Sequence, residues 1–306
     1  PESGRGGSER RQRICYCGYS RTDWKGEFVA HLDFSRDGND LNIDGNLMPS
    51  TLYLNAKEWK IDSSYVNIWK DGIKSANARF TSNNQEIHIH GGTSLTKAKT
   101  LNLDLANFDI SIINPILKSD LGIKGIASGN LQLTSPLKQK GILIDLRSDS
   151  TYFANCRIGQ LNLTSDWDEN FQRFNITATT KIDGRTALDA RARFTPKISE
   201  LEAQAKLDKV DVGYLAPILK NTFSDVHGYV SGEVTADGPI DNLTWESRNT
   251  RIENGGLRVN YTNVPYFVDG NFSFSNTGLE FDNVLGRDRY TGTAYINGGI
   301  KWNSKF

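Results

Sequence analysis

Residues 105–118 read LANFDISIINPILK, and residues 207–220 read LDKVDVGYLAPILK. The two stretches align without a gap, so that Asp109 pairs with Asp211 at an offset of 102 residues, and both end in Pro-Ile-Leu-Lys. Each is followed by a glycine, a Ser-Gly pair and a proline, with the Ser-Gly pairs at 128–129 and 231–232. Agreement at so many ordered positions indicates an internal duplication, which decides the architecture to look for.

Each copy of the repeat predicts a strand, a capped short helix and a return to strands. Leu101, Leu103 and Leu105 alternate with mostly polar residues, which is typical of a strand with one apolar face. The carboxylate of Asp109 or Asp211 is suited to accept hydrogen bonds from the free N–H groups of a first helical turn. Apolar residues then recur at helical spacing, and the central proline should kink the helix or split it.

Outside these stretches, apolar and polar residues alternate in runs of five to eight residues, separated by Asp-Gly, Asn-Gly or Gly-Gly signals. Such runs predict strands joined by tight turns, upwards of about fifteen in this chain. We expect a mostly β protein with a long, curved and twisted sheet that forms an elongated apolar groove. Two short amphipathic helices interrupt the sheet. A closed barrel or sandwich would show the same alternation.

The repeat divides the chain into four parts. We expect a first β-repeat over 26–136 with a helix near 109–120, and a second over 137–239 with a helix near 211–223. Residues 240–306 add further strands to the same sheet. Residues 1–25 hold several glycines and arginines without periodicity. We interpret them as a disordered basic linker, or as sequence not native to the fold, rather than as a tail that binds anionic lipid or nucleic acid.

Composition excludes several classes of protein. Lys and Arg total 36, as do Asp and Glu, so no basic field predicts nucleic-acid binding. Hydrophobic residues make up 37% of the chain, which is enough for it to fold but not for a large core. No apolar window is long enough to span a membrane. The three cysteines imply no disulfide framework. The chain begins at Pro1 without a signal peptide, so we interpret it as an internal or truncated piece of a longer protein.

Few residues suggest chemistry. His88 and His90 lie on one side of a predicted strand at a spacing that could hold a metal, but no motif supplies a third ligand, and we favour a solvated polar face. Cys15-Tyr16-Cys17 has no second cysteine pair, so zinc is not predicted there. The common nucleophile, phosphate-binding, dinucleotide and metalloprotease motifs do not occur. We expect no active site, no cofactor and no metal, and therefore not an enzyme.

Several motifs in order carry a family resemblance. They are the strand–Asp–helix unit ending in Pro-Ile-Leu-Lys, the Gly-x-x-Ser-Gly of Gly125–Gly129 with its second copy from Gly228, NGGLRVNY at 254–261, and GTAYINGGI at 292–300. On these residues the chain, over roughly 28–306, resembles the TamB family within the AsmA-like group, and in particular its Bacteroidetes-type members. Residues 1–25 do not match the pattern.

The resemblance implies a long periplasmic protein of the cell envelope, the inner-membrane component of a translocation and assembly module. Such a protein is anchored in the inner membrane by an N-terminal helix and reaches an outer-membrane barrel of the Omp85 type. Neither the anchor nor the family's C-terminal region is found in this chain, so anchoring and docking would use other parts of the protein.

The first function that this reading predicts is a hydrophobic groove for phospholipid transfer between the inner and outer membranes. An apolar inner face would shelter acyl chains, at about 0.8 kcal/mol per buried methylene, while the headgroups stay in water. The apolar positions expected to line this groove are Leu41, Ile43, Leu52, Leu54, Ile87, Ile89, Leu101, Leu103, Leu131, Leu133, Ile142, Ile144, Leu161, Leu163, Val259, Tyr261, Phe272 and Phe274. The same residues would also suit the packed core of a closed sandwich.

The alternative function is a factor for protein secretion and assembly that offers sheet edges to nascent outer-membrane strands. A third hypothesis is a β-solenoid adhesin or enzyme, but solenoids repeat every 20 to 50 residues, and no constellation of carboxylates is present. Bound cargo distinguishes the first two, because only an open apolar groove should carry phospholipid.

Overall fold

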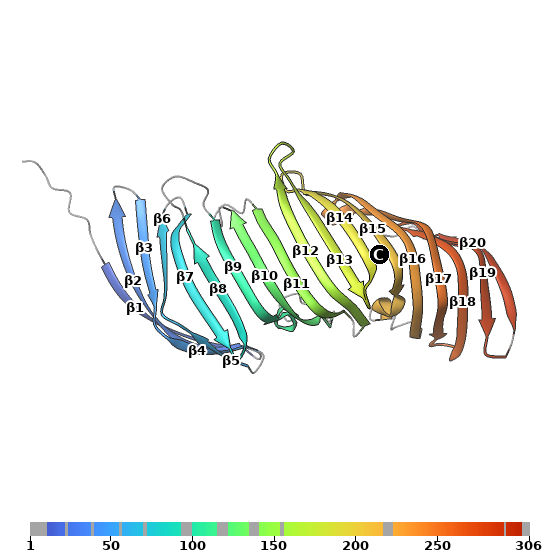
Figure 1. Cartoon of the computed structure of the whole chain (residues 1–306), viewed down its shortest axis with the longest axis horizontal. Helices are drawn as coiled ribbons and strands as arrows, with labels where there is room; N and C mark the ends of the chain where they lie inside the picture. Colours follow the sequence, from blue (N-terminus) through green and yellow to red (C-terminus); the bar gives the residue numbers. More distant parts are fainter. Residues whose placement is uncertain are drawn as a thin grey trace, which may run out of the picture. The chain divides into compact units, whose positions relative to one another are not determined.

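The structure of the chain is a computed structural model. It describes residues 11–21, 24–37, 40–54, 57–69, 72–92, 100–114, 122–134, 141–153, 156–216, 223–290 and 292–301. Nearly all of this described chain is β-strand (Figure 1), and its strands belong to one large antiparallel sheet. Within the same residues no helix has the length and apolarity needed to cross a membrane. The prediction of a mostly β protein built on one large sheet is confirmed.

The chain divides into two compact units. Unit 1 comprises Pro1–Ile112 and Ala127–Leu146, and unit 2 comprises Ile113–Ile126 and Arg147–Phe306. These bounds do not follow the predicted repeats at 26–136, 137–239 and 240–306. Compact units are set by contacts between strands, whereas a repeat is a property of the sequence, so the division into repeats stays a prediction.

The strands of unit 1 mostly pair with their neighbours in the chain. They are β1 (Arg11–Arg21), β2 (Trp24–Asp37), β3 (Asp40–Leu47), β4 (Ser50–Leu54), β5 (Lys57–Ile61), β6 (Ser64–Trp69), β7 (Gly72–Ser82), β8 (Gln85–Gly91) and β9 (Thr100–Asp109), followed by β10 (Lys124–Thr134) and the start of β11 (Gly141–Phe153).

The long strand β2 departs from this simple order. Its residues 24–27 pair with β4 and its residues 30–37 pair with β3, so two shorter strands lie end to end beside it. β3 then pairs with β6 and β4 with β5, and both β5 and β6 pair with β7. The β4–β5 hairpin therefore fills the end of the sheet that the shorter β3 and β6 leave open (Figure 1).

Strand β1 corrects the expectation that residues 1–25 do not fold. Arg11–Arg21 pair with β2 in an unbroken antiparallel register, from Arg11 opposite Phe34 to Arg21 opposite Trp24. The sequence lacks a clear apolar alternation here, but strand pairing is made by backbone groups, which every residue other than proline supplies. Residues 1–10 lie outside the described residues.

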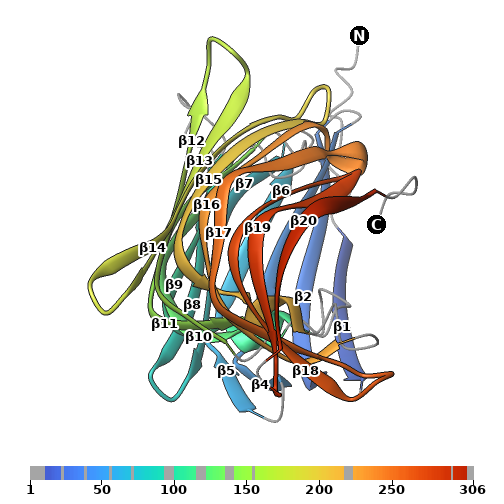
Figure 2. The same ribbon diagram turned by 90° about the vertical axis from the view of Figure 1, so that its right-hand side faces the viewer.

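Unit 2 is an antiparallel meander in which each strand from β12 to β20 pairs with the next. Its strands are β12 (Cys156–Asp168), β13 (Arg173–Ile182), β14 (Arg185–Thr195), β15 (Glu200–Asp211), β16 (Phe223–Pro239), β17 (Thr244–Val259), β18 (Val264–Ser275), β19 (Gly278–Asp288) and β20 (Thr293–Lys301), with the 3-10 turn η4 (Ile240–Asn242) between β16 and β17. The ladders from β16 to β20 contain repeated register shifts, which bend strands, and these strands are visibly bent in Figure 2.

The two copies of the repeated motif form the same β-bulge. Asn107 in β9 and Lys209 in β15 both have a positive φ, of 50° in each case. In the second copy the register between β15 and β16 shifts at this point, between Leu207 and Val210. The extra residue turns the side chains that follow toward the opposite face of the strand, and this explains why Phe108 reaches Trp59, with ring centroids 6.3 Å apart.

The Ser-Gly pair that follows each copy also has a structural reason. Gly129 and Gly232 have φ of 150° and 146°, and each lies against the backbone of the next strand. A Cβ added to Gly129 would stand 2.0 Å from the carbonyl oxygen of Asp145, and one added to Gly232 would stand 2.8 Å from Cα of Thr250. Only glycine fits these positions without movement of the neighbouring strand.

The aspartate of each copy was expected to cap a short helix, and in the described residues it caps a 3-10 turn. Asp109 Oδ1 accepts a hydrogen bond from the N–H of Ser111 at 3.0 Å, and Asp211 Oδ1 accepts one from the N–H of Gly213 at 2.8 Å. The turns that follow are 3-10 turns, η1 (Ile110–Ile113) and η3 (Val212–Leu215). Residues 115–120 and 217–222 of the two expected helices lie outside the described residues, and Phe223 already belongs to β16.

The largest fully buried side chain among the described residues of unit 1 is Trp59 in β5, which lies near Phe108 at the end of β9. Trp59 is 0% exposed, and Ile61 and Ile112 are also buried. Beside them Lys57 forms an ion pair with Asp109 at 2.5 Å. Burial of a residue as large as tryptophan removes much apolar surface from water at this point of the unit.

Candidate functional site: a one-sided apolar sheet

Cross-strand pairs join the apolar side chains of unit 1 on one face. Ile43 in β3 lies opposite both Phe34 in β2 and Ile68 in β6. Ile87 in β8 lies opposite both Phe80 in β7 and Leu105 in β9. Directly opposed residues of an antiparallel pair point to the same face, so apolar rows run across these strands.

The predicted lining residues of unit 1 mostly belong to this face. Register places Ile43, Leu52, Ile87, Ile89, Leu101 and Leu103 on it, and all six side chains are half-buried. Leu131, Leu133 and Ile144 are half-buried in β10 and β11. Leu41 is 46% exposed at the start of β3. The side chains of Leu54 and Ile142 lie outside the described ones.

Unit 2 repeats this arrangement with smaller side chains. One row runs through Leu163, Ala178, Ala190, Ala205 and Val234, and the next runs through Ile176, Ala192, Ala203, Ala236 and Trp245. Strands lie about 4.8 Å apart, so each row crosses β13 to β16 over roughly 14 Å. We call these two rows the alanine lane.

Larger side chains border the alanine lane at both ends of its strands. One border row is Trp167, Phe174, Phe194 and Leu201, and the opposite border includes Leu161, Leu188 and Leu207. Between them the surface forms a shallow apolar depression of about 160 Å³ over the alanines. A cavity of about 150 Å³ holds one benzene molecule, so the depression seats a short length of an alkyl chain and not a whole lipid.

The remaining predicted residues of unit 2 divide between strands and turns. Phe272 lies opposite Phe281 and beside Phe274, whose ring is stacked on it at 5.9 Å, and Val259 is half-buried at the end of β17. Tyr261 is a correction, because it is 97% exposed in the turn between β17 and β18. The N–H of Asn263 donates to the carbonyl of Val259 at 2.8 Å and closes that turn, so the apparent alternation through Tyr261 is turn sequence.

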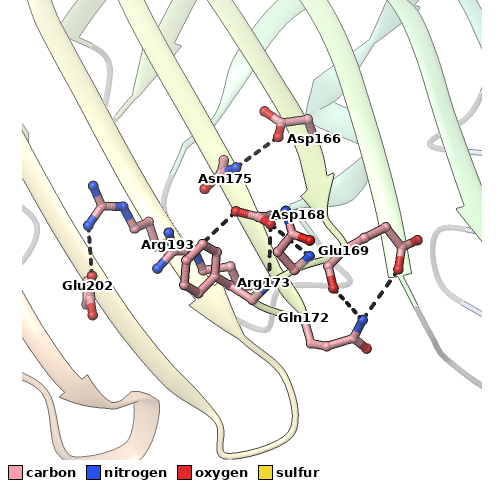
Figure 3. A network of polar contacts seen from close by, with 10 residues as sticks. Asp166, Asp168, Glu169, Gln172, Arg173, Asn175, Arg193 and Glu202 are labelled. Carbon is pink, nitrogen blue, oxygen red and sulfur yellow. Dashed lines mark hydrogen bonds and ion pairs between the residues drawn. The ribbon is translucent and has the colours of Figure 1, made fainter.

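The opposite face of unit 2 is polar. Asp166, Asn175, Arg193 and Glu202 occupy one cross-strand row over β12 to β15 (Figure 3). Asn175 Nδ2 donates to Asp166 Oδ2 at 2.9 Å, and Arg193 Nη1 pairs with Glu202 Oε2 at 3.2 Å. These exposed pairs contribute little stability, but they keep this face hydrated.

Sequence reasoning overlooked the alanine lane because it searched for large apolar residues. The signal was present in Ala190 and Ala192, and again in Ala203 and Ala205, which alternate with charged and polar residues. Period-two alanines in a strand would have identified these positions, but not their alignment across strands.

A scan against protein-family models, a search of curated proteins and a search of solved structures each found no match to this chain.

Proposed function

We propose that this chain is a periplasmic segment of a TamB-like protein, whose one-sided apolar sheet carries phospholipid acyl chains between the inner and outer membranes. One observation carries the proposal: the apolar rows are continuous across the strands, and the side chains in them are only partly buried. In the part of the chain that the structure describes, all strands belong to one sheet, so no second sheet covers these rows. A large apolar surface left in this state is typical of a binding face.

The expected strength of binding fits a conduit. Full burial of a methylene gives about 0.8 kcal/mol, and a sheet that covers one side of an alkyl chain gives roughly half of that. About ten methylenes on such a face would therefore gain on the order of 4 kcal/mol, which corresponds to a dissociation constant near 1 mM. Binding this weak lets a lipid move along the rows, whereas a deep pocket would retain it.

The alanine lane supports the same function by its shape. Alanine side chains leave room above the backbone, and the larger residues on both borders restrict sideways movement. A flexible alkyl chain that lies across the strands would therefore contact apolar surface below and at both sides. The headgroup would remain in the water beside the sheet.

Lipid extraction followed by mass spectrometry tests the proposal on the full chain made in a bacterial periplasm. We expect phospholipid to co-purify with the wild-type protein and to be reduced in Leu163→Asp and Ala205→Asp. Asn162→Asp and Gln204→Asp are matched controls, because each lies next to its partner variant on the polar face of the same strand. A folded wild-type protein free of lipid would contradict the proposal.

Strand β20 favours a second candidate function, assembly of outer-membrane proteins together with an Omp85-type barrel. The described side chains of residues 293–299 are exposed, including Tyr295 and Ile296. An exposed strand at the end of a sheet can accept another strand by β-augmentation. Cross-linking from Tyr295 to an unfolded outer-membrane protein, in a chain that carries no lipid, would support this function.

A further inference from the structure

We propose that the polar face of unit 1 holds a binding site for a divalent transition metal, Zn²⁺ by its ligand chemistry, formed by His88, His90 and Asp104. The proposal does not depend on lipid transfer. The sequence placed the two histidines on one side of a strand but supplied no third ligand. The pairing of β8 with β9 supplies it, because Asp104 lies directly opposite His88.

The three side chains already converge. Their candidate ligand atoms all lie within 4.8 Å of one another. His90 Nε2 is 2.6 Å from Asp104 Oδ2, and the rings of His88 and His90 are stacked with centroids 4.6 Å apart. Ligand atoms of tetrahedral zinc stand about 3.3 Å apart, given bond lengths of about 2.0–2.2 Å. Rotations that move these atoms by roughly an ångström would therefore complete the site.

Neighbouring amides hold two of the three ligands. Asn130 Nδ2 donates to Asp104 Oδ1 at 2.6 Å, so Oδ2, the oxygen beside His90 Nε2, is the one that would bind a metal. His88 Nε2 lies 2.7 Å from Asn77 Oδ1. An amide oxygen only accepts, so Nε2 carries the proton and the lone pair is on Nδ1. Outer partners of this kind orient the ligands of known metal sites and set the histidine tautomer.

The ionisation of the cluster also suits a cation. Burial lowers the pKa of His88, and the nearby His90 and Arg79 lower it further, so its imidazole is neutral at neutral pH. Burial alone would raise the pKa of Asp104, but hydrogen bonds from Asn130 and His90 outweigh it, and the pKa is lowered. Arg79, the one cation that faces the cluster from β7 among the described residues, is paired with Glu86 at 3.4 Å.

Two histidines and one carboxylate form a three-ligand set with one position left for water or another ligand. Nitrogen ligands favour Zn²⁺ or Cu²⁺ over Mg²⁺ or Ca²⁺, which prefer oxygen. Imidazole and carboxylate ligands bind a metal in their deprotonated form, so Zn²⁺ competes with protons for this site, and its affinity should fall as the solution is made more acidic.

Titration calorimetry of the metal-stripped full chain with Zn²⁺ tests the site. We expect one ion per chain, and His90→Gln and Asp104→Asn should each reduce the affinity at least tenfold. Asn130→Ala, which removes an outer partner and no ligand, should reduce it by about 10- to 100-fold. His31→Gln and His227→Gln are the matched controls and should leave the affinity unchanged, because each removes a histidine outside the cluster.

Cysteine thiolates also bind Zn²⁺, so the titration needs a cysteine-free chain as a second control. The titration is repeated in a chain with Cys15→Ser, Cys17→Ser and Cys156→Ser, in which the same stoichiometry and the same loss with Asp104→Asn are expected. Circular dichroism establishes that each variant remains folded. Absence of Zn²⁺ binding to the wild-type chain, or equal binding by the wild type and His90→Gln, would overturn the proposal and identify the cluster as a hydrated pair of histidines.

Discussion

The backbone N–H of Asn107 donates a hydrogen bond to Ser128 Oγ at 2.9 Å, and the N–H of Lys209 donates to Ser231 Oγ at the same distance. Both donors are bulge residues with positive φ, which lack a partner in the regular ladder. The duplicated sequence therefore forms the same structural motif twice. It consists of a bulge, a serine that accepts the hydrogen bond of the bulge N–H, and a glycine that lets the next strand approach.

Removal of this serine should destabilise the chain modestly. We expect Ser231→Ala to lower the free energy of unfolding by about 0.5–1 kcal/mol, because the bulge N–H is exposed and water can replace the hydroxyl. Ser150→Ala, in an exposed strand position, is the control and should have no measurable effect. The midpoint of urea denaturation measures both, and equal midpoints for the two variants would contradict a role for the serine.

The two capping aspartates should respond differently to loss of charge. Burial alone would raise the pKa of Asp109, but hydrogen bonds from Lys57 and Ser111 outweigh it and hold the pKa below its usual value. A lowered pKa stabilises the fold above the unfolded value, near 3.9, and this contribution is lost as the pH falls through the folded value. Asp109→Asn keeps the cap but not the ion pair.

We therefore expect Asp109→Asn to cost about 1 kcal/mol at neutral pH, a figure reduced for the partial exposure of Lys57, and to cost less as the pH falls below the unfolded pKa. Asp211→Asn is the matched control, because among the described residues no lysine occupies the position that Lys57 has beside Asp109. Denaturation at several pH values measures the difference. A deficit in Asp109→Asn that is constant with pH would count against the ion pair.

Replacement of Trp59 should test whether its surroundings form the hydrophobic core of unit 1. Trp59→Ala should lower the free energy of unfolding by about 3–5 kcal/mol, because it removes a fully buried side chain and leaves a cavity beside Phe108. Phe171→Ala, which removes an exposed ring from the β12–β13 turn, should change it by less than about 0.5 kcal/mol. Similar losses in both variants would show that this cluster is not a core.

Filling the alanine lane should separate lipid binding from stability. Ala205→Leu adds apolar volume to the depression, so the protein should remain folded while the amount of co-purified phospholipid falls. Gln204→Leu places the same side chain on the opposite face of β15 and should retain the lipid. Unchanged lipid content in Ala205→Leu would show that phospholipid binds to a surface other than the alanine lane.

The local parts of the fold were the most predictable from sequence. Alternation with period two identified the strands, and the aligned aspartates identified the two caps, because both signals depend on residues close in the chain. The elements that follow the caps were expected to be helices, and their described residues form 3-10 turns. Strand β1 was overlooked because it pairs through its backbone and shows little apolar alternation. Tyr261 was misplaced because a turn sequence continued an apparent alternation by chance.

The sequence by itself determined that this protein is built of strands with one apolar face, and that a strand–aspartate–turn unit occurs twice. Only the tertiary structure decided which residues of different strands are neighbours, including Asp104 beside His88 and the alanines of β13, β14 and β15 in common rows. The physical reason is that side-chain direction follows from local backbone geometry, whereas register is chosen by the pairing of whole strands, and a shift of one residue would reverse every face.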